Sequence, residues 1–293
     1  MSRAATAGIA FIVLSSVIFA PLTQTVTKFL AEAFPIIQIM FFRSLGQTVW
    51  MFVFFWPSHR IEMFRSKRPV LQILRSGLLF VSAMLWVAAV AEVPLTTASA
   101  INFTAPIMVV ILSIPLLGER VGIHRWAAVA VGFIGAMIVI QPGAGEVPVE
   151  VFYLAGAAFL FALYQIMTRK LTAIDSDATS SVYTVIVALV VSAALVPWHF
   201  EMPTTDTALV WTAFAASGLL GGVRHFLVIK AYANAPASVI SPFFYGELVG
   251  VATLGYLVFG DVPAQTTWLG AVVIVASGLY IAHRERLSAK QDS

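Results

Sequence analysis

The sequence contains no cysteine and few charged residues. The absence of cysteine excludes disulfides, thiol nucleophiles and thiolate metal sites. Only 11% of the 293 residues are Asp, Glu, Lys or Arg, whereas an ordinary soluble domain has about 25%. Hydrophobic residues make up 60% of the chain, and the mean hydropathy is +0.92. This composition predicts a polytopic membrane protein with almost no domain outside the bilayer.

Motifs of several functional classes are also missing. No G-x-x-x-x-G-K-[ST] loop occurs, which excludes ATP hydrolysis by that route. There is no H-E-x-x-H pair, no span with arginine at every third position as in a voltage sensor, and no filter motif of a pore. We therefore predict that the chain is not an enzyme, uses no cofactor or catalytic metal, and binds no nucleic acid.

The most informative feature present is an internal repeat with a period of 142 residues. It aligns Pro94 with Pro236 and Gly118 with Gly260, without a gap. Each copy contains five apolar spans, and an odd number of crossings forces the second copy to enter the membrane from the opposite side. The fold class predicted is an all-α membrane protein with ten transmembrane helices in two inverted five-helix repeats. The first repeat covers 1–142, and the second covers 143–293 with a short cytoplasmic tail.

Each predicted span is close to the roughly 20 residues that cross a bilayer. In chain order the predicted spans are 5–27, 36–56, 70–91, 95–117, 121–140, 149–168, 179–198, 209–232, 237–259 and 266–283.

Lysine and arginine are distributed unevenly between the two sides of these spans. Lys28 is the only basic residue assigned to one side, and Arg43 and Arg224 lie within spans. The other fourteen, Arg75 among them, are assigned to the termini or to alternate loops. Basic loops face the cytoplasm, so we predict that both termini are cytoplasmic.

Two charged residues lie deep in the predicted spans. Glu247 is at the middle of the ninth span, and Arg43 is slightly to the outer side of the middle of the second. Burying a charge there costs about 2.5 kcal/mol or more, so each must face a cavity or a partner. Glu247 would contact a substrate ammonium group or carry a coupling proton, and Arg43 would capture a carboxylate. Alternatively, the two form a structural ion pair with each other, or Arg43 extends to the outer interface.

Other polar and aromatic residues near mid-span are candidates for the wall of a substrate cavity. Asn102 shares a helix face with a proline that breaks the fourth span, and its repeat mate is Phe244. The alternatives are a helix–helix hydrogen bond for Asn102 and lipid-facing or packed positions for the aromatic side chains. The candidate substrate-binding residues are Arg43, Trp86, Asn102, Tyr164, Gln165, His225, Phe244 and Glu247. Arg224 is interpreted as a snorkelling or cytoplasmic-gate cation.

Small residues indicate where helices approach closely. Gly218 with Gly222, and Gly246 with Gly250, have the G-x-x-x-G spacing, which favours close helix packing. Alternatively, these glycines act as pivots. Pro21 is predicted to bend the first helix near its outer end, and Pro242 to bend the ninth.

Residues 88–135 resemble the EamA-type branch of the drug/metabolite transporter superfamily. In that pattern a span ends in an alanine-rich turn, and a helix with a mid-span proline, a Gly-Glu pair and a glycine-spaced helix follow. Here these elements are Pro94, Pro106, Gly118-Glu119, Gly132 and Gly135. The second copy repeats the pattern with Pro236 and Gly260-Asp261 but has Leu248 where the proline would fall, and Arg43 matches the second-span arginine of the family.

The resemblance implies a carrier in the bacterial inner membrane, with a central cavity lined by helices 1–4 and 6–9. Within the superfamily the chain looks like the amino-acid exporters, those for aromatic amino acids included. We therefore expect export of amino acids by alternating access, with partners limited to a small-molecule substrate and the lipid bilayer. The chain would be a monomer or a weak homo-oligomer. An importer, an exporter of another metabolite or drug, and a lipid-moving or non-transporting scaffold remain as alternatives.

Overall fold

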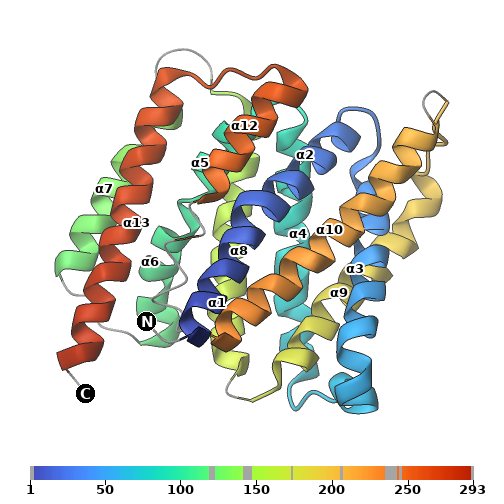
Figure 1. Cartoon of the computed structure of the whole chain (residues 1–293), viewed down its shortest axis with the longest axis horizontal. Coiled ribbons are helices and arrows are strands. Elements are labelled where there is room, and N and C mark those ends of the chain that lie inside the picture. Colours follow the sequence, from blue (N-terminus) through green and yellow to red (C-terminus); the bar gives the residue numbers. More distant parts are fainter. Residues whose placement is uncertain are drawn as a thin grey trace.

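A computed structural model describes residues 3–118, 123–140, 147–172, 174–204, 207–234, 243 and 246–291. Every regular element in these residues is helical. Figure 1 shows the helices side by side, extending at different tilts between the two ends of the molecule, with both chain termini at one end. That arrangement agrees with an even number of crossings, and ten helical spans follow one another along the chain.

In the first half, three spans are single helices and two are interrupted. The elements are α1 (Arg3–Val13), η1 (Leu14–Phe19), α2 (Ala20–Ala31), α3 (Ile36–His59), η2 (Arg60–Phe64), α4 (Pro69–Val90), α5 (Leu95–Asn102), α6 (Ala105–Leu117) and α7 (Ile123–Ile140). The second half contains α8 (Val149–Thr172), α9 (Asp177–Leu195), η3 (Val196–Trp198), α10 (Thr207–Asn234), α12 (Glu247–Phe259) and α13 (Gln265–Gln291). Pro242 and Phe244 lie outside the described residues.

The outer surface of the bundle is apolar, as lipid contact requires. Six helices in the described part of the chain are long and apolar enough to cross a membrane, and shorter apolar helices lie at 130–140, 247–259 and 265–277. Large side chains such as Val49, Phe133 and Leu257 are exposed on the surface. In water such a surface would drive association, whereas in a bilayer it faces hydrocarbon.

Helix packing confirms the inverted repeat. Helix α4 packs along α8, and its counterpart α10 packs along α1, η1 and α2; α3 packs on its own counterpart α9, and α7 on α13. One hydrogen bond repeats this symmetry at equivalent positions. Ser82 Oγ donates to the Ala157 carbonyl at 2.8 Å, and Ser15 Oγ donates to the Arg224 carbonyl at 3.3 Å. Positions 15 and 157, and 82 and 224, are one repeat apart, so the two halves are related by a two-fold axis.

The two helix ends that the repeat aligns have the same backbone conformation. Gly118 ends α6 with φ 69°, and Gly260 ends α12 with φ 70°. A residue with a Cβ is strained in this left-handed region, so glycine is required at both ends.

The first span is not a continuous α-helix, and the prolyl residue predicted to bend it explains why. Pro21 has no N–H to donate to the carbonyl of Val17, and the preceding turn, η1, is π-helical. Ser16 Oγ donates to the Ile12 carbonyl and to the Phe243 carbonyl, both at 2.8 Å. The hydrogen bond to Phe243 therefore connects the distorted turn of the first span to the ninth span.

The fourth span is interrupted at the predicted place. Helix α5 ends at Asn102, a turn covers Phe103 and Thr104, and α6 restarts with Pro106 in its first turn. A proline four residues after Asn102 cannot donate to the Asn102 carbonyl, so the ladder breaks there.

Glycines bring three helix pairs into close contact, which confirms the packing interpretation. A Cβ added to Gly46 of α3 would lie 2.7 Å from the Cα of Gly218 of α10. Gly250 faces Pro21 in the same way, and Gly135 of α7 faces Gly270 of α13. The pair α7–α13 lies at one edge of the bundle in Figure 1, apart from α10 and α3.

Candidate functional site

The deepest acid of the bundle, Glu247, pairs with a cation from a neighbouring helix. Glu247 is 6% exposed, and its Oε2 accepts a hydrogen bond from Arg224 Nη2 at 3.0 Å. It lies twelve residues before the end of α12 at Phe259, or about 18 Å at 1.5 Å per residue. That depth is near the middle of a hydrocarbon core about 30 Å thick.

Two neutral side chains extend this pair into a network across four spans. Gln24 of α2 donates from Nε2 to Glu247 Oε1, and Ser99 of α5 donates to Gln24 Oε1 at 3.2 Å. Glu247 belongs to α12 and Arg224 to α10, so these contacts join four spans. We call Gln24, Ser99, Arg224 and Glu247 the central network. One repeat away from Glu247 and Gln24 lie Ala105 and Ile166, whose side chains cannot form the same hydrogen bond, so the repeat does not duplicate this contact.

The alternative of an ion pair between Arg43 and Glu247 is therefore wrong, because the partner of Glu247 is Arg224. The sequence predicts a snorkelling or cytoplasmic-gate cation at Arg224, whereas its side chain is 31% exposed and bonds Glu247. Arg43 is half-buried on α3, a helix that packs against α10, the helix of Arg224. The two helices meet at Gly46 and Gly218, three residues after Arg43 and six residues before Arg224.

A second cation, Arg75, was assigned to the loops and is instead buried inside α4. It is 1% exposed, and Nη2 donates to the Ser180 carbonyl and to Thr184 Oγ1, each at 2.6 Å. Nη1 donates to Thr168 Oγ1 at 3.0 Å, and the guanidinium carbon lies 5.0 Å from the centre of the Tyr164 ring. All of these partners are neutral. Its burial was indicated in the sequence by its position as the sixth residue of the predicted third span, 70–91.

The Arg75 contacts continue towards the end of the bundle where the exposed cations gather. Arg75 Nε donates to Gln72 Oε1 at 3.1 Å, and Gln72 Nε2 donates to Asp175 at 2.9 Å. Asp175 also accepts from Ser66 Oγ and from the backbone N–H of Lys67. Partial burial opposes ionisation of Asp175, but these hydrogen bonds outweigh it and lower the pKa of the carboxyl below its ordinary value of 3.8.

The other predicted site residues lie at different places in the bundle. Trp86 is half-buried between two hydrophobic clusters, and Asn102 is half-buried at the break of the fourth span. Tyr164 stacks on Phe161 with ring centres 5.8 Å apart. Gln165 is half-buried on the same helix.

His225 is the predicted residue with the most exposed side chain. It is exposed, yet the charges of Arg224, Arg75 and Arg43 all act on it. Those three arginines come from α10, α4 and α3. His225 therefore lies at the surface of α10, next to Arg224 in the chain.

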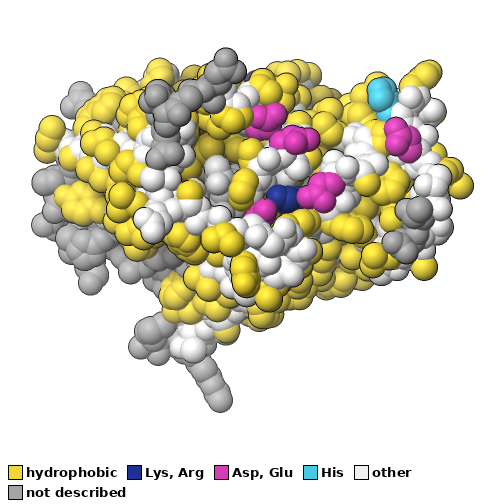
Figure 2. Space-filling model, turned by 90° about the horizontal axis from the view of Figure 1, so that it is seen from above, with side chains coloured by type: hydrophobic (Ala, Val, Ile, Leu, Met, Phe, Trp, Pro, Cys, Tyr) yellow, Lys and Arg dark blue, Asp and Glu magenta, His cyan; other side chains and the backbone are white. Residues whose placement is uncertain are grey.

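The end of the bundle opposite the termini is acidic. Its exposed carboxylates include Glu32, Glu92 and Glu201. Figure 2 looks onto this end and shows several acidic side chains around one dark-blue basic patch. Lys28 Nζ lies here, 3.0 Å from Asp261 Oδ2 and 3.0 Å from the Val93 carbonyl oxygen. This pair ties α2 to the end of α12.

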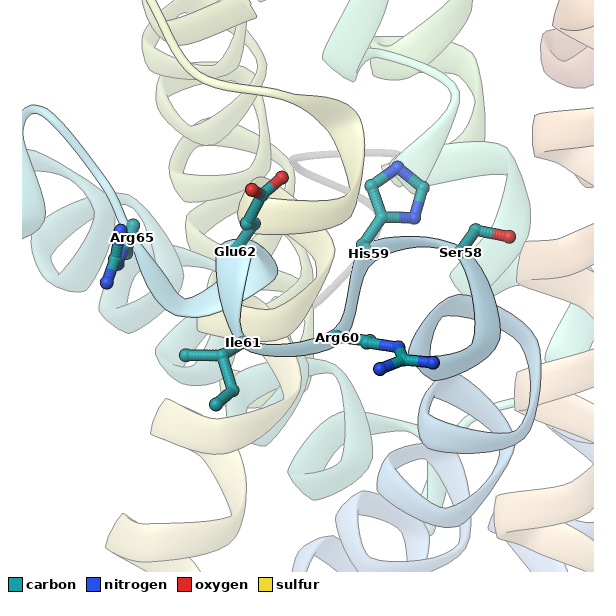
Figure 3. Close-up of a pocket in the computed structure, with 6 residues that line it drawn as sticks. All are labelled: Ser58, His59, Arg60, Ile61, Glu62 and Arg65. Atoms are coloured by element: carbon teal, nitrogen blue, oxygen red, sulfur yellow. The ribbon is translucent and has the colours of Figure 1, made fainter.

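A surface pocket next to the end of α3 does not form a binding site. It is lined by residues 58–62 and Arg65. Figure 3 shows Glu62 and His59 on one side of the ribbon, Ile61 on the other and Arg65 turned away, so the charged groups do not converge.

An inverted pair of five-helix repeats around a polar centre is the architecture of a secondary transporter. The chain belongs to the EamA-like transporter family, whose model matches residues 6–141 and 149–282, once in each half. The chain is thus a multi-pass membrane transporter and not an enzyme.

Curated relatives of this chain are named as transporters of riboflavin or of S-adenosylmethionine. A riboflavin transporter of Vibrio cholerae is 32% identical over 98% of this chain and 94% of its own length. A second riboflavin transporter, from Rhizobium johnstonii, is 32% identical over 95% of this chain and 89% of its own length. An S-adenosylmethionine uptake transporter of Rickettsia felis is 29% identical over 96% of this chain and 95% of its own length.

One solved crystal structure has the same fold. It superposes with a TM-score of 0.63, covering 96% of this chain and 98% of that chain at 17% sequence identity.

Proposed function

We propose that this transporter takes up a metabolite that contains a heteroaromatic ring, with riboflavin as the first candidate. The observation that carries the proposal is the 32% identity to a riboflavin transporter over 98% of the chain. Riboflavin and S-adenosylmethionine both join a fused nitrogen heterocycle to a hydroxylated chain or sugar. These names favour an importer of a metabolite over the amino-acid exporter that the sequence suggested.

The interior of the bundle has groups suited to such a molecule. Trp86 and Tyr164 offer ring faces for stacking, and the amides of Asn102 and Gln165 offer donors and acceptors for ring or hydroxyl groups. We propose these residues, with Arg43, His225, Phe244 and Glu247, as the substrate-binding set. Gln24 and Arg224 join them because they hold Glu247.

Alternating access accounts for the polar contacts at both ends of the bundle. Lys28 with Asp261 closes the acidic end, and Asp175 with Gln72 joins helices at the basic end. We propose that transport opens one end while the other stays joined, around the central network.

Uptake into proteoliposomes tests the substrate. Purified protein is reconstituted, and entry of labelled riboflavin, S-adenosylmethionine, phenylalanine and tryptophan is compared with entry into empty vesicles. We expect saturable entry of a ring-containing metabolite, riboflavin or S-adenosylmethionine, with no entry of the two amino acids. Entry of the amino acids alone would favour the amino-acid transporter that the sequence analysis predicts. Movement of a labelled lipid instead would favour the lipid-moving alternative.

Reporter fusions test the orientation in the membrane. We propose cytoplasmic termini because exposed cations such as Arg65 and Lys67 gather at the end of the termini. A fusion after Ser58 is expected to report a cytoplasmic location, and a fusion after His199 a periplasmic one. The opposite pattern would invert the assigned direction of both ends.

A further inference from the structure

Arg224 extends from α10 towards α12 across the first span. Its guanidinium Nη2 donates to Glu247 Oε2 at 3.0 Å, and α2 packs against both α10 and α12. The backbone carbonyl of Arg224 accepts from Ser15 Oγ of η1 at 3.3 Å, and Gln24 of α2 donates to Glu247 Oε1. The pair therefore contacts groups of both repeats near the middle of the bundle.

The two members of the pair differ in accessibility. The Glu247 side chain is 8% exposed, whereas 31% of the Arg224 side chain is exposed. A guanidinium has several N–H donors, and among the described residues one donor of Arg224 bonds Glu247. Other donors of Arg224 are therefore available to a ligand, directly beside the carboxylate.

Gln24 and Ser99 fix the carboxylate of Glu247 as an acceptor. Ser99 Oγ donates to Gln24 Oε1 at 3.2 Å, so the amide of Gln24 presents its N–H to Glu247 Oε1. Each carboxylate oxygen can accept more than one hydrogen bond, so Oε2 retains an acceptor position beside Arg224. The pair thus presents an acceptor and donors side by side.

We infer that the Arg224–Glu247 pair binds the edge of a heterocycle on which an N–H donor and an acceptor are neighbours. The ring N–H would donate to Glu247 Oε2, and the neighbouring ring acceptor would accept from Arg224. Two adjacent hydrogen bonds to charged groups hold a planar ring in one orientation. The inference rests on the proposed function and names the part of the substrate that this pair recognises.

Riboflavin and S-adenosylmethionine both present such an edge. The flavin ring has an imide N–H between two carbonyl oxygens, and the adenine ring has an amino group next to a ring nitrogen. Their chains differ, because that of riboflavin is neutral and that of S-adenosylmethionine is charged. Recognition of the ring edge therefore suits both candidate substrates, whereas recognition of the chain would suit one of them.

Matched ligand pairs test the requirement for a donor on the ring. Binding to the purified full-length protein is measured for riboflavin against 3-methylriboflavin, in which a methyl group replaces the imide N–H. Adenosine against purine riboside removes the amino donor without adding bulk, and uridine against 3-methyluridine repeats the comparison without a flavin or adenine ring. In each pair that binds, we expect the member with the donor to bind about tenfold or more tightly, because its analogue leaves the carboxylate unpaired.

Variants locate the recognised edge at this pair. Arg224→Met with Glu247→Leu removes both charges together, so no buried charge is left unpaired, and the two members of each ligand pair should then bind equally. Arg224→Lys keeps a charge and donors beside Glu247 and should keep part of the preference. The control, Glu62→Gln with Arg65→Gln, removes one acid and one cation at exposed positions outside the spans and should leave the preference unchanged. Thermal unfolding of each variant confirms that it is folded.

The two proposals fail in different ways. Equal binding of riboflavin and 3-methylriboflavin, and of adenosine and purine riboside, would overturn the edge recognition and leave the proposed function standing. Preference for uridine over 3-methyluridine, without binding of any flavin or adenine compound, would support the edge recognition and overturn the proposed substrate. A preference that persists in the folded Arg224→Met, Glu247→Leu variant would overturn the assignment to this pair, as would absent binding in all three ligand pairs.

Discussion

At the scale of single residues, the buried charges of this protein differ in the groups that they contact. Glu247 and Arg224 satisfy each other at mid-depth, whereas Arg75 is satisfied by neutral oxygens. Depth in a span identified Glu247 and Arg43 from the sequence, because a charge there always needs an explanation. Depth did not identify the partner, because which residues face each other depends on how the helices rotate and cross.

The Glu247–Arg224 pair is expected to stabilise the fold and also to serve transport. Glu247→Gln or Arg224→Gln alone leaves an uncompensated buried charge and should cost about 3–5 kcal/mol. The double variant should recover most of that stability, because neither charge remains, while transport stays lost. Thermal unfolding and proteoliposome flux for the singles and the double measure both effects, with the exposed Glu62→Gln as control. Rescue of flux by the double variant would reduce the pair to a structural role.

Asp175 makes stability depend on pH at the basic end. Its pKa is lowered in the folded state, so its stabilising contribution is fully present above the ordinary value and is lost as the pH falls through the lower folded value. Asp175→Asn should therefore destabilise the protein at pH 7, by about 1 kcal/mol after allowance for solvent screening. It should flatten the fall in unfolding temperature below pH 4. An unchanged acid profile would contradict this role.

At the scale of elements, the interruptions in the helices are set by local chemistry. Pro21 follows a π-helical turn, Pro106 follows the break after Asn102, and Gly118 and Gly260 end helices in the left-handed conformation. The effects of the two prolines were predicted from the sequence, because proline cannot donate to the helical hydrogen-bond ladder. The sequence showed Gly118 and Gly260 only as aligned positions of the repeat. Close helix crossings, by contrast, need two small residues on different helices to meet.

The α3–α10 crossing should be sensitive to a single methyl group. In Gly46→Ala the new Cβ would lie 2.7 Å from the Gly218 Cα, so the helices must separate, at a cost of about 1–3 kcal/mol. Gly77→Ala in α4 is the matched control, because nothing lies within 4 Å of its added Cβ. That change should be neutral or stabilising by about 0.5–1 kcal/mol. Similar unfolding temperatures for the two variants would argue against a tight crossing.

At the scale of the whole molecule, the two-fold relation makes the ends of the bundle comparable but not identical. Lys28 bonds Asp261 at the acidic end, and the repeat places Lys170 and Glu119 as their counterparts. Glu119 lies outside the described residues. Among the described residues, Lys28 is the cation that joins α2 to the end of α12 at the acidic end.

Locking the acidic end is expected to stop transport. The chain has no native cysteine, so Lys28→Cys with Asp261→Cys can be joined by a short bis-methanethiosulfonate reagent. The joined protein should lose flux, because α2 and α12 can no longer separate, and reduction should restore it. Each single-cysteine variant treated with the reagent controls for modification alone. Full flux in the joined protein would place the moving gate elsewhere.

The sequence by itself determined the number of spans, the inverted repeat, the proline breaks in two helices and the depth of Arg43 and Glu247. These follow from hydropathy, from a fixed period and from the backbone chemistry of proline and glycine, all of which act locally along the chain. Tertiary structure alone decided that Glu247 bonds Arg224 rather than Arg43, and that Arg75 is buried. Those outcomes depend on which faces of α3, α4, α10 and α12 meet, which is set by packing between residues far apart in the chain.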